Sequence, residues 1–315
     1  MTEKVLVTGG AGFIGSHIAD ALLKEGKHVR ILDSFITGKR ENLKDVQNDI
    51  ELIEGDVRDH ECVRKSARGC QWIFHQAALR SVPKSVDNPA LTNDINISGT
   101  LTALVAAREE NVQRFVYASS SSVYGETDVV PEKEDAAPNP VSPYAVSKLA
   151  GEHYCRAFSH IHGLYTISLR YFNVFGPRQD PESLYSAVVP KFIQQAMRGE
   201  PYEIHGDGLQ SRDFTYISNV VDANLSAARS TGIRGEYFNV ACGTTTSIMG
   251  IAEAISKLMN KPVLLNHTPI RAGDVRITHA DVSKAKKLMN CAAEINLENG
   301  LKQTIDFFVK NPHRL

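Results

Sequence analysis

Tyr144 and Lys148 are the two residues whose types and spacing most directly predict proton-transfer chemistry. They lie in the segment SPYAVSK, at 142–148, which has the pattern of a helix start. Residues four apart on a helix share a face, so both side chains point the same way. A free tyrosine has a pKa of about 10 and is a poor base at neutral pH. A neighbouring ammonium group stabilises the phenolate, and the pair therefore predicts a general base.

A run of four serines at 119–122 supplies a second candidate group for the same chemistry. The run ends a strand-like segment, and a hydroxyl there can share the hydrogen bond to a substrate and assist proton transfer. By itself, the tyrosine and lysine spacing is more typical of a core tyrosine followed by a solvated lysine. A dinucleotide-binding loop upstream, together with these serines, favours the catalytic interpretation.

The glycine-rich segment GGAGFIG, at 9–15, is typical of a loop that binds the pyrophosphate of a dinucleotide. It follows the strand-like run VLVT and opens into an apolar helical pattern, which is the context that makes a G-x-G-x-x-G motif specific. Glycines let the backbone approach a pyrophosphate, and the following helix offers free N–H groups and a positive dipole end. The alternative is a tight strand-to-helix turn with a surface aspartate nearby.

Asp33 ends the second strand-like run, near the ~20-residue offset expected for an acid that binds the adenosine ribose. Its carboxylate would accept hydrogen bonds from both ribose hydroxyls and would repel a 2′-phosphate. The residue therefore favours NAD over NADP as the cofactor. Lys39 and Arg40, two nearby cations, are the observation against this choice.

Short β-branched runs alternate with helical patterns through the first half of the chain. Strands are predicted at 5–8, 28–33, 50–56, 72–77, 114–119 and 165–171, and helices at 15–25, 61–68, 95–110 and 144–162. This alternation predicts right-handed β-α-β crossovers and a doubly wound parallel sheet. In the second half, proline and glycine interrupt the pattern, and helices are predicted at 188–198, 248–259 and 300–309.

We therefore predict an α/β fold in two parts. Residues 1–175 would form an NAD-binding Rossmann domain that carries the serine, the tyrosine and the lysine. Residues 176–315 would form mainly a smaller α/β lobe that binds substrate, with some segments returning to the Rossmann domain. The lobe is expected at the carboxyl edge of the sheet, where open α/β folds bind ligands.

The composition disfavours several classes of partner. Lys and Arg number 35 against 36 Asp and Glu in 315 residues. The chain therefore lacks the basic excess that is typical of proteins that mainly bind nucleic acid. The five cysteines include no C-x-x-C pair, which predicts reduced thiols and no metal site. No run approaches the roughly 20 apolar residues of a membrane helix, and no apolar leader is present. We expect a soluble cytoplasmic protein.

The chain resembles the extended short-chain dehydrogenase/reductases, and among them the nucleotide-sugar 4-epimerases. The resemblance covers nearly the whole chain. It rests on VTGGAGFIG at 7–15, HQAA at 75–78, VYG at 123–125, SPY at 142–144 with Lys148, RYFNVFGP at 170–177, SRDF at 211–214 and GDVR at 273–276. The stretch RSVPKS, at 80–85, is similar to a stretch of the UDP-N-acetylglucosamine 4-epimerases.

The resemblance implies a role for each matching residue. Tyr144 would be the catalytic base, Lys148 would hold the nicotinamide ribose and lower the tyrosine pKa, and Ser120 would be the hydroxyl partner. The implied NAD contacts are Gly9, Gly12, Phe13, Ile14, Gly15, Asp33, Ser34, Phe35, Thr37, Gly38, Asp56, Val57, Gln76, Ala77, Ala78, Arg80, Asn96, Tyr144, Lys148 and Tyr171. The implied UDP-sugar contacts are Ser81, Ser120, Ser121, Ser122, Tyr144, Asn173, Val189, Ile204, His205, Arg212, Arg271, Asp274 and Thr278.

Redox-neutral epimerisation is the chemistry that the resemblance implies. Tyr144 would take the proton of the sugar 4-hydroxyl as hydride passes from C4 to NAD. The 4-keto sugar would then turn about its diphosphate and take the hydride back on its other face. Related 4,6-dehydratases carry an Asp-Glu pair where this chain has Ser121 and Ser122, and decarboxylating relatives carry a Glu there. Elimination and decarboxylation are therefore disfavoured.

The sugar is predicted from Thr278, which aligns with a bulky tyrosine in epimerases limited to UDP-glucose and UDP-galactose. A small residue there leaves room for an N-acetyl group, so we predict UDP-GlcNAc and UDP-GalNAc as substrates, with the non-acetylated pair as second substrates. UDP-glucuronate 4-epimerisation is the alternative, because Arg80 or Lys84 could face a carboxylate. A dinucleotide-binding sensor without activity is a further alternative, although such proteins commonly lack the tyrosine or the lysine.

Family resemblance also predicts a homodimer. Members usually pair through two long helices per subunit, which would be 95–110 and 144–162 here. Leu101, Leu104 and Val105 are apolar at helical spacing in the first of these helices. That pattern is equally typical of ordinary core.

Overall fold

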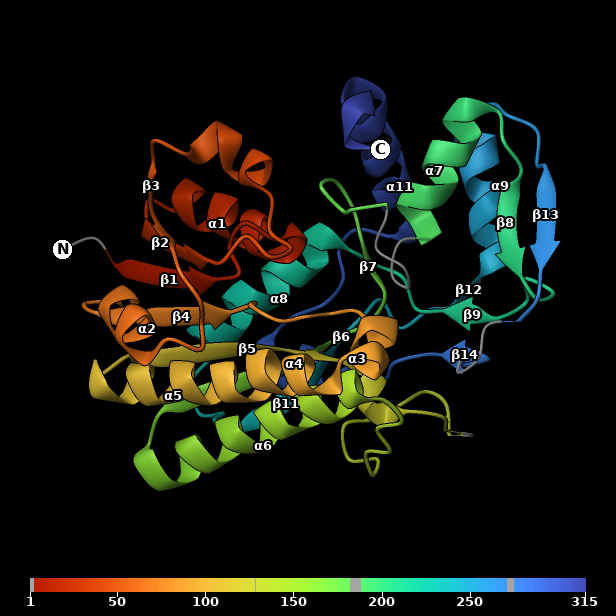
Figure 1. Ribbon diagram of the computed structural model, residues 1–315. Coiled ribbons are helices and arrows are strands. Elements are labelled where there is room, and N and C mark those ends of the chain that lie inside the picture. The colour runs from red at the N-terminus through yellow and green to blue at the C-terminus, as the bar shows by residue number, and fades with distance from the viewer. Residues whose placement is uncertain (1–2, 128, 182–187, 271–274) are drawn as a thin grey trace.

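Seven parallel strands form the central sheet (Figure 1). The computed structural model describes residues 3–127, 129–181, 188–270 and 275–315. In sheet order the strands are β3 (Ile50–Glu54), β2 (His28–Asp33), β1 (Lys4–Thr8), β4 (Trp72–His75), β5 (Arg114–Ser120), β6 (Tyr165–Tyr171) and β11 (Glu236–Val240). All six predicted strands are present, with β3 and β4 ending earlier than predicted. The prediction of a Rossmann-type α/β fold is confirmed.

Helices cover both faces of this sheet (Figure 1). They are α1 (Phe13–Lys24) and α8 (Ile217–Arg229) on one face, and α2 (His60–Ala67), α5 (Gly99–Glu109) and α6 (Pro143–His162) on the other. The first strand shows why both faces need a cover. Val5 and Val7 pack on the α1 side and Leu6 on the α5 side, all fully buried. Because successive side chains of a strand point to opposite faces, a continuous apolar run requires helices on both.

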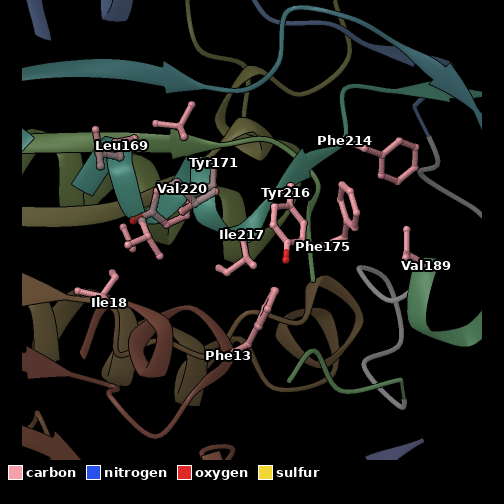
Figure 2. Packing of buried hydrophobic residues seen from close by; sticks show 14 of the residues in the cluster. Phe13, Ile18, Leu169, Tyr171, Phe175, Val189, Phe214, Tyr216, Ile217 and Val220 are labelled. Atoms are coloured by element: carbon pink, nitrogen blue, oxygen red, sulfur yellow. The ribbon is translucent and has the colours of Figure 1, made fainter. Parts of the chain in front are cut away.

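The second half of the chain contributes strand β11 to the sheet and helix α8 to its cover. Glu236–Val240 pairs with β6, and α8 packs against α1, as the side chains of Ile18, Val220 and Leu169 show in Figure 2. Neither element was predicted: β11 is a run of only five residues, and α8, although 13 residues long, lies in the half of the chain where proline and glycine interrupt the pattern. The assignment of residues 1–175 and 176–315 to separate domains stays a prediction.

Beyond the sheet, the second half builds a smaller lobe (Figure 1). The predicted helices are present there as α7 (Val188–Arg198), α9 (Ile248–Met259) and α11 (Leu297–Lys310). Short strands complete it: β8 (Tyr202–His205) with β13 (Leu265–Thr268), β9 (Ser211–Arg212) between β12 (Thr246–Ser247) and β14 (Ile277–Thr278), and β7 (Val174–Phe175) with β10 (Thr215–Tyr216). The remaining short helices are α3 (Val82–Asp87), α4 (Pro89–Asn93), α10 (Ser283–Met289), a π-turn at Asp94–Ser98, and 3₁₀ turns at Arg40–Val46, Ser121–Tyr124 and Pro312–Arg314.

Helix α6 begins where its sequence predicts. The Ser142 hydroxyl accepts a hydrogen bond from the N–H of Ala145, and Pro143 occupies the first helical position. Both features favour a helix start, because the cap satisfies a free N–H and proline has none to leave unpaired. The helix ends before Gly163, whose φ of 69° is the left-handed conformation typical of a C-terminal glycine. Tyr144 therefore sits in the first turn, beside the carboxyl end of β5.

Candidate active site

A cleft lies at the carboxyl ends of β1, β2, β4 and β5, with an empty volume of about 980 Å³ that includes space open to solvent. Ligand sites in proteins commonly measure about 300–1,000 Å³. The predicted cofactor residues that line it are Gly9, Gly12, Phe13, Ile14, Gly15, Asp33, Ser34, Thr37, Gly38, Val57, Gln76, Ala77, Ala78, Arg80, Tyr144, Lys148 and Tyr171. The structure thus brings the loop, the acid and the tyrosine–lysine pair to one cavity.

The glycine loop has the shape that a phosphate cradle requires. Gly9 has a φ of 67°, and a Cβ on it would lie 2.7 Å from the backbone of Ala77. A Cβ on Gly15 would lie 2.3 Å from the carbonyl oxygen of Gly9. Gly12 precedes α1 without a side-chain cap, so the N–H groups of the first turn stay available for a ligand. The residues present therefore fit a bound pyrophosphate.

Asp33 ties this loop to the end of β2. Its Oδ2 accepts from the N–H of Ala11 at 2.8 Å, and its Oδ1 accepts from the N–H of Phe35 at 2.8 Å. Burial raises the pKa of the Asp33 carboxyl, and the two N–H donors act in the opposite direction. The backbone of Gly38 lies against the carboxylate, where a Cβ would be 2.6 Å from Oδ1. The acid is therefore held at the rim where an adenosine ribose is expected.

Tyr144, Ser120 and Lys148 meet at the other end of the cleft. Lys148 is 4% exposed, and its Nζ donates to the carbonyl oxygen of Ala118 at 2.8 Å. Burial lowers the pKa of Lys148 to about 7. Burial raises the pKa of Tyr144, opposed first by a hydrogen bond with Ser120 and then by the charge of Arg80. The arrangement places a base, a hydroxyl partner and two cations around one reaction centre.

The groups that lower the pKa of Tyr144 differ from those expected from the sequence, which assigned this role to Lys148. Its Nζ lies 5.9 Å from the centroid of the Tyr144 ring and is directed to a backbone carbonyl. Ser120 and Arg80 are the groups that lower the tyrosine pKa in the structure. A role of Lys148 in lowering it stays a prediction for the NAD-bound protein.

Three predicted cofactor residues lie beside the cleft and do not line it. Asp56 forms an ion pair with Arg58 at 2.7 Å, and Phe35 packs under Arg40. Asn96 is buried, and its side chain bonds both backbone groups of Leu79 as well as the hydroxyl of Ser147. Asn96 thus joins the cleft wall to α6.

Sequence reasoning missed several residues of the cleft wall. They are Leu32, Ile36, Gly55, Leu79, Ile95, Ala118 and Ser119. Most are apolar or contribute backbone, so their types carry no chemical signal. Asn224 was also missed. From α8 it bonds the hydroxyl of Tyr171 at 2.9 Å, and Gln76 bonds the same hydroxyl at 3.2 Å.

The predicted substrate residues divide into three groups. Asn173 and Thr278 lie together, since Nδ2 of Asn173 donates to Oγ1 of Thr278 at 3.1 Å. Arg212 pairs with Thr278 between β9 and β14, and Ser120, Ser121 and Ser122 form one turn beside Tyr144. Ser81 caps α3, and His205 bonds Thr268, while the side chains of Val189 and Ile204 are buried in the core. Arg271 and Asp274 lie outside the described residues.

Among the described residues, no group of three or more His, Cys, Asp or Glu side chains is arranged to hold a metal ion. In the same part of the chain, no helix is both long and apolar enough to cross a membrane.

A parallel Rossmann sheet, a glycine loop after its first strand, an acid after its second and a Tyr-x-x-x-Lys helix beside a serine turn define an extended short-chain dehydrogenase/reductase. The model of the NAD dependent epimerase/dehydratase family matches residues 5–241. The chain belongs to this family, and its cofactor is NAD.

Relatives match over nearly their full length. UDP-glucose 4-epimerase of Mycolicibacterium smegmatis is 36% identical over 309 residues, covering 97% of this chain and 98% of the relative. The solved UDP-N-acetylglucosamine 4-epimerase of Methanobrevibacter ruminantium, in complex with UDP-N-acetylmuramic acid, is 39% identical with a TM-score of 0.93, covering 99% and 100%. UDP-glucuronic acid 4-epimerase of Bacillus cereus, solved in complex with UDP-glucuronic acid and NAD, is 33% identical with a TM-score of 0.90, covering 98% of this chain and 99% of that one.

Proposed function

We propose that this NAD-dependent nucleotide-sugar epimerase inverts C4 of UDP-GlcNAc and UDP-GalNAc, with UDP-glucose and UDP-galactose as second substrates. The observation that carries 4-epimerisation is the convergence of Tyr144, Ser120 and Lys148 at one end of the dinucleotide cleft. The full-length relatives include 4-epimerases of three different UDP-sugars, which supports the reaction while leaving the sugar to the residues of this chain.

In the proposed mechanism, the phenolate oxygen of Tyr144 takes the proton of the sugar 4-hydroxyl. Ser120 holds that hydroxyl in line, and its own hydrogen bond favours the phenolate form of the tyrosine. NAD, held by the glycine loop and Asp33, would supply the hydride acceptor and then the hydride donor for C4. Lys148, buried beside the tyrosine, would anchor the nicotinamide ribose. Tyr144 returns the proton once the keto sugar has presented its other face.

The serine turn supports epimerisation over elimination. Oγ of Ser122 donates to Oγ of Ser120 at 3.0 Å, and the N–H of Ser122 donates to the same oxygen at 3.2 Å. Expulsion of the 6-hydroxyl needs an acid and a base near C6. Serine hydroxyls at 121 and 122 supply neither at neutral pH, so the keto sugar is left intact for the return of hydride.

Thr278 supports the acetylated sugars. It is a half-buried, small residue that meets Asn173 through its hydroxyl. We expect Thr278→Tyr to lower kcat/KM for UDP-GlcNAc by about tenfold or more relative to UDP-glucose, because bulk fills the space for the N-acetyl group. Thr278→Val is the matched control, since it keeps the size and removes only the hydrogen bond. Equal losses of kcat/KM on both sugars in Thr278→Tyr would contradict the proposal that residue 278 selects the sugar by its size.

UDP-glucuronate is the second candidate substrate, and Arg80 is the observation that favours it. Arg80 lines the cleft, is exposed, and lies close enough for its charge to act on Tyr144. A guanidinium there could pair with a sugar carboxylate. Arg80→Met should then lower kcat/KM for UDP-glucuronate more than for the neutral sugars, which lose only the effect of the Arg80 charge on Tyr144.

Turnover by the purified protein without added NAD tests the proposal directly. UDP-GlcNAc, UDP-glucose and UDP-glucuronate are incubated separately, and the epimers are resolved by chromatography. Formation of UDP-GalNAc supports the proposed substrate. Conversion of UDP-glucose alone keeps the mechanism and rejects the Thr278 argument, whereas no conversion of any sugar with NAD supplied rejects 4-epimerisation.

A further inference from the structure

Glu152 and Arg170 form a fully enclosed ion pair between α6 and β6. Nε and Nη2 of Arg170 donate to the two carboxylate oxygens at 2.9 and 2.8 Å. Arg170 is 0% exposed and Glu152 is 3% exposed. The rings of Tyr124 and Tyr237 lie 4.7 and 4.2 Å from the guanidinium carbon. Two charges have thus been removed from water at a single place in the fold.

The carboxylate of this pair also bonds a residue of the cleft wall. Oε1 of Glu152 accepts from the hydroxyl of Ser119 at 2.5 Å. Ser119 lines the cleft and directly precedes Ser120 at the end of β5. Along α6, Glu152 lies one turn after Lys148 and two turns after Tyr144, so the three side chains share one face of the helix. Glu152 therefore contacts the strand that carries the serine from the helix that carries the base.

The charged surroundings of Lys148 single out this carboxylate. The titratable groups facing it are Tyr144, Glu152 and Cys155 on α6, Tyr117 on β5 and His75 on β4. Burial lowers the pKa of His75 to about 3, so this ring is neutral. Burial raises the pKa of Cys155 and of Tyr117, so the thiol and the phenol are neutral as well. Cys155 and Glu152 are the two groups that oppose the effect of burial on the Lys148 pKa, and with the thiol neutral the charged one is the Glu152 carboxylate, one helical turn away and paired with Arg170.

We propose that Glu152 is a positioning residue of the epimerisation site, whose carboxylate favours the ammonium form of Lys148 and ties the Ser119–Ser120 strand end to α6. The inference rests on the proposed function. A purely structural role of the pair is the alternative, because removing one partner of a buried ion pair is strongly destabilising whatever lies near it.

Two substitutions separate these roles. Glu152→Gln keeps the shape and removes the charge, but it leaves Arg170 without its bidentate partner. The double variant Glu152→Gln with Arg170→Met removes that uncompensated cation as well, and replacing both partners of a buried pair commonly restores stability. Glu134→Gln is the matched control, since Glu134 is also buried and its pKa is affected by Arg170, yet it bonds Asn239 and does not face Lys148.

The readout is the alkaline limb of the pH profile. Loss of the Glu152 charge makes Lys148 release its proton at lower pH, so kcat should decline with rising pH about one unit earlier than in the wild type. We expect this shift in Glu152→Gln and in the double variant. In Glu134→Gln we expect kcat to decline at the same pH as in the wild type. Because Lys148 is expected to bind the nicotinamide ribose, NAD affinity of the cofactor-free protein should show the same shift.

If kcat and NAD affinity of the double variant decline with rising pH as in the wild type, the inference is overturned in favour of a structural role, whether or not the melting temperature is lower. A shift of equal size in Glu134→Gln would overturn it too. A wild type that converts no UDP-sugar rejects the proposed function instead. The pH dependence of NAD affinity then decides the inference by itself.

Discussion

The phenol of Tyr144 is the group on which the proposed reaction depends, and its removal separates an enzyme from a sensor. Tyr144→Phe deletes the oxygen that takes the proton and leaves the ring in the cleft wall. We expect turnover to fall about 10²–10⁴-fold, the usual contribution of a general base. NAD content, measured by absorbance after denaturation, should equal that of the wild type. Undiminished turnover would remove Tyr144 from the mechanism.

His75, at the end of β4, predicts how stability depends on acid. Its ring is 1% exposed between the hydroxyls of Thr8 and Thr100, and burial lowers its pKa from 6.5 to about 3. The unfolded chain therefore binds a proton that the folded one does not between these values. Stability conferred by the neutral ring is complete above pH 6.5 and is lost as the pH falls towards 3, by up to about 1.4 kcal/mol per unit.

Denaturant unfolding of wild type and His75→Gln between pH 7 and pH 4.5 measures this contribution. Glutamine retains donors and acceptors for Thr8 and Thr100 but does not titrate. We expect the variant to be less stable at pH 7 and to lose stability less steeply below pH 6.5. Parallel curves for the two proteins would assign the acid sensitivity to other groups.

At the scale of the element, the start of α1 depends on Gly15. A Cβ there would lie 2.3 Å from the carbonyl oxygen of Gly9. That oxygen belongs to the backbone of the loop, which cannot move aside without distorting the loop. Gly15→Ala should therefore distort the phosphate loop and weaken NAD binding by about tenfold or more, as judged by titration of the cofactor-free protein. The alternative outcome, wild-type affinity, would show that the loop tolerates the methyl group.

Gly250 offers a matched control for that substitution. It is the third residue of α9, as Gly15 is of α1, and its nearest neighbours are the side chains of Thr246 and Ser247 at 3.1 and 3.2 Å. Those side chains can shift by a few tenths of an ångström. Gly250→Ala should leave NAD affinity unchanged, so a loss shared by both variants would point to a general effect of alanine on the fold.

At the scale of the whole molecule, the predicted homodimer stays a prediction. Leu104 is fully buried in the core between the sheet and α5, and Leu101 and Val105 pack against the same core. These apolar residues are therefore accounted for within one chain. On α6, Val146 is 48% exposed and Ile161 is 70% exposed, which leaves apolar surface on the second helix of the predicted interface.

Light scattering on the NAD-bound protein should give twice the chain mass of 34.6 kDa if the homodimer forms. Val146→Glu together with Ile161→Glu should then shift the mass to that of one chain, because two like charges would face their copies across the interface. A single-chain mass for the wild type would reject the dimer, and a variant that stays dimeric would place the interface elsewhere.

Local patterns in the sequence determined the phosphate loop, the first six strands, the start of α6 and the pairing of Tyr144 with Lys148. Each depends on residues within a few positions of one another: glycine spacing, alternation of apolar runs, a cap with a proline, and helical periodicity. The same reasoning placed Asp33 at a strand end, and the structure shows its carboxylate bonded to the loop it was predicted to serve.

Only the tertiary structure decided which distant residues share the site. Glu152 meets Ser119 across 33 positions, Tyr171 meets Asn224 across 53, and Asn173 meets Thr278 across 105. The positions of β11 beside β6 and of α8 against the sheet were decided in the same way, by burial against partners elsewhere in the chain. Periodicity reports which face of an element is apolar. Where the partner elements lie determines the contacts of that face and of every buried polar group on it.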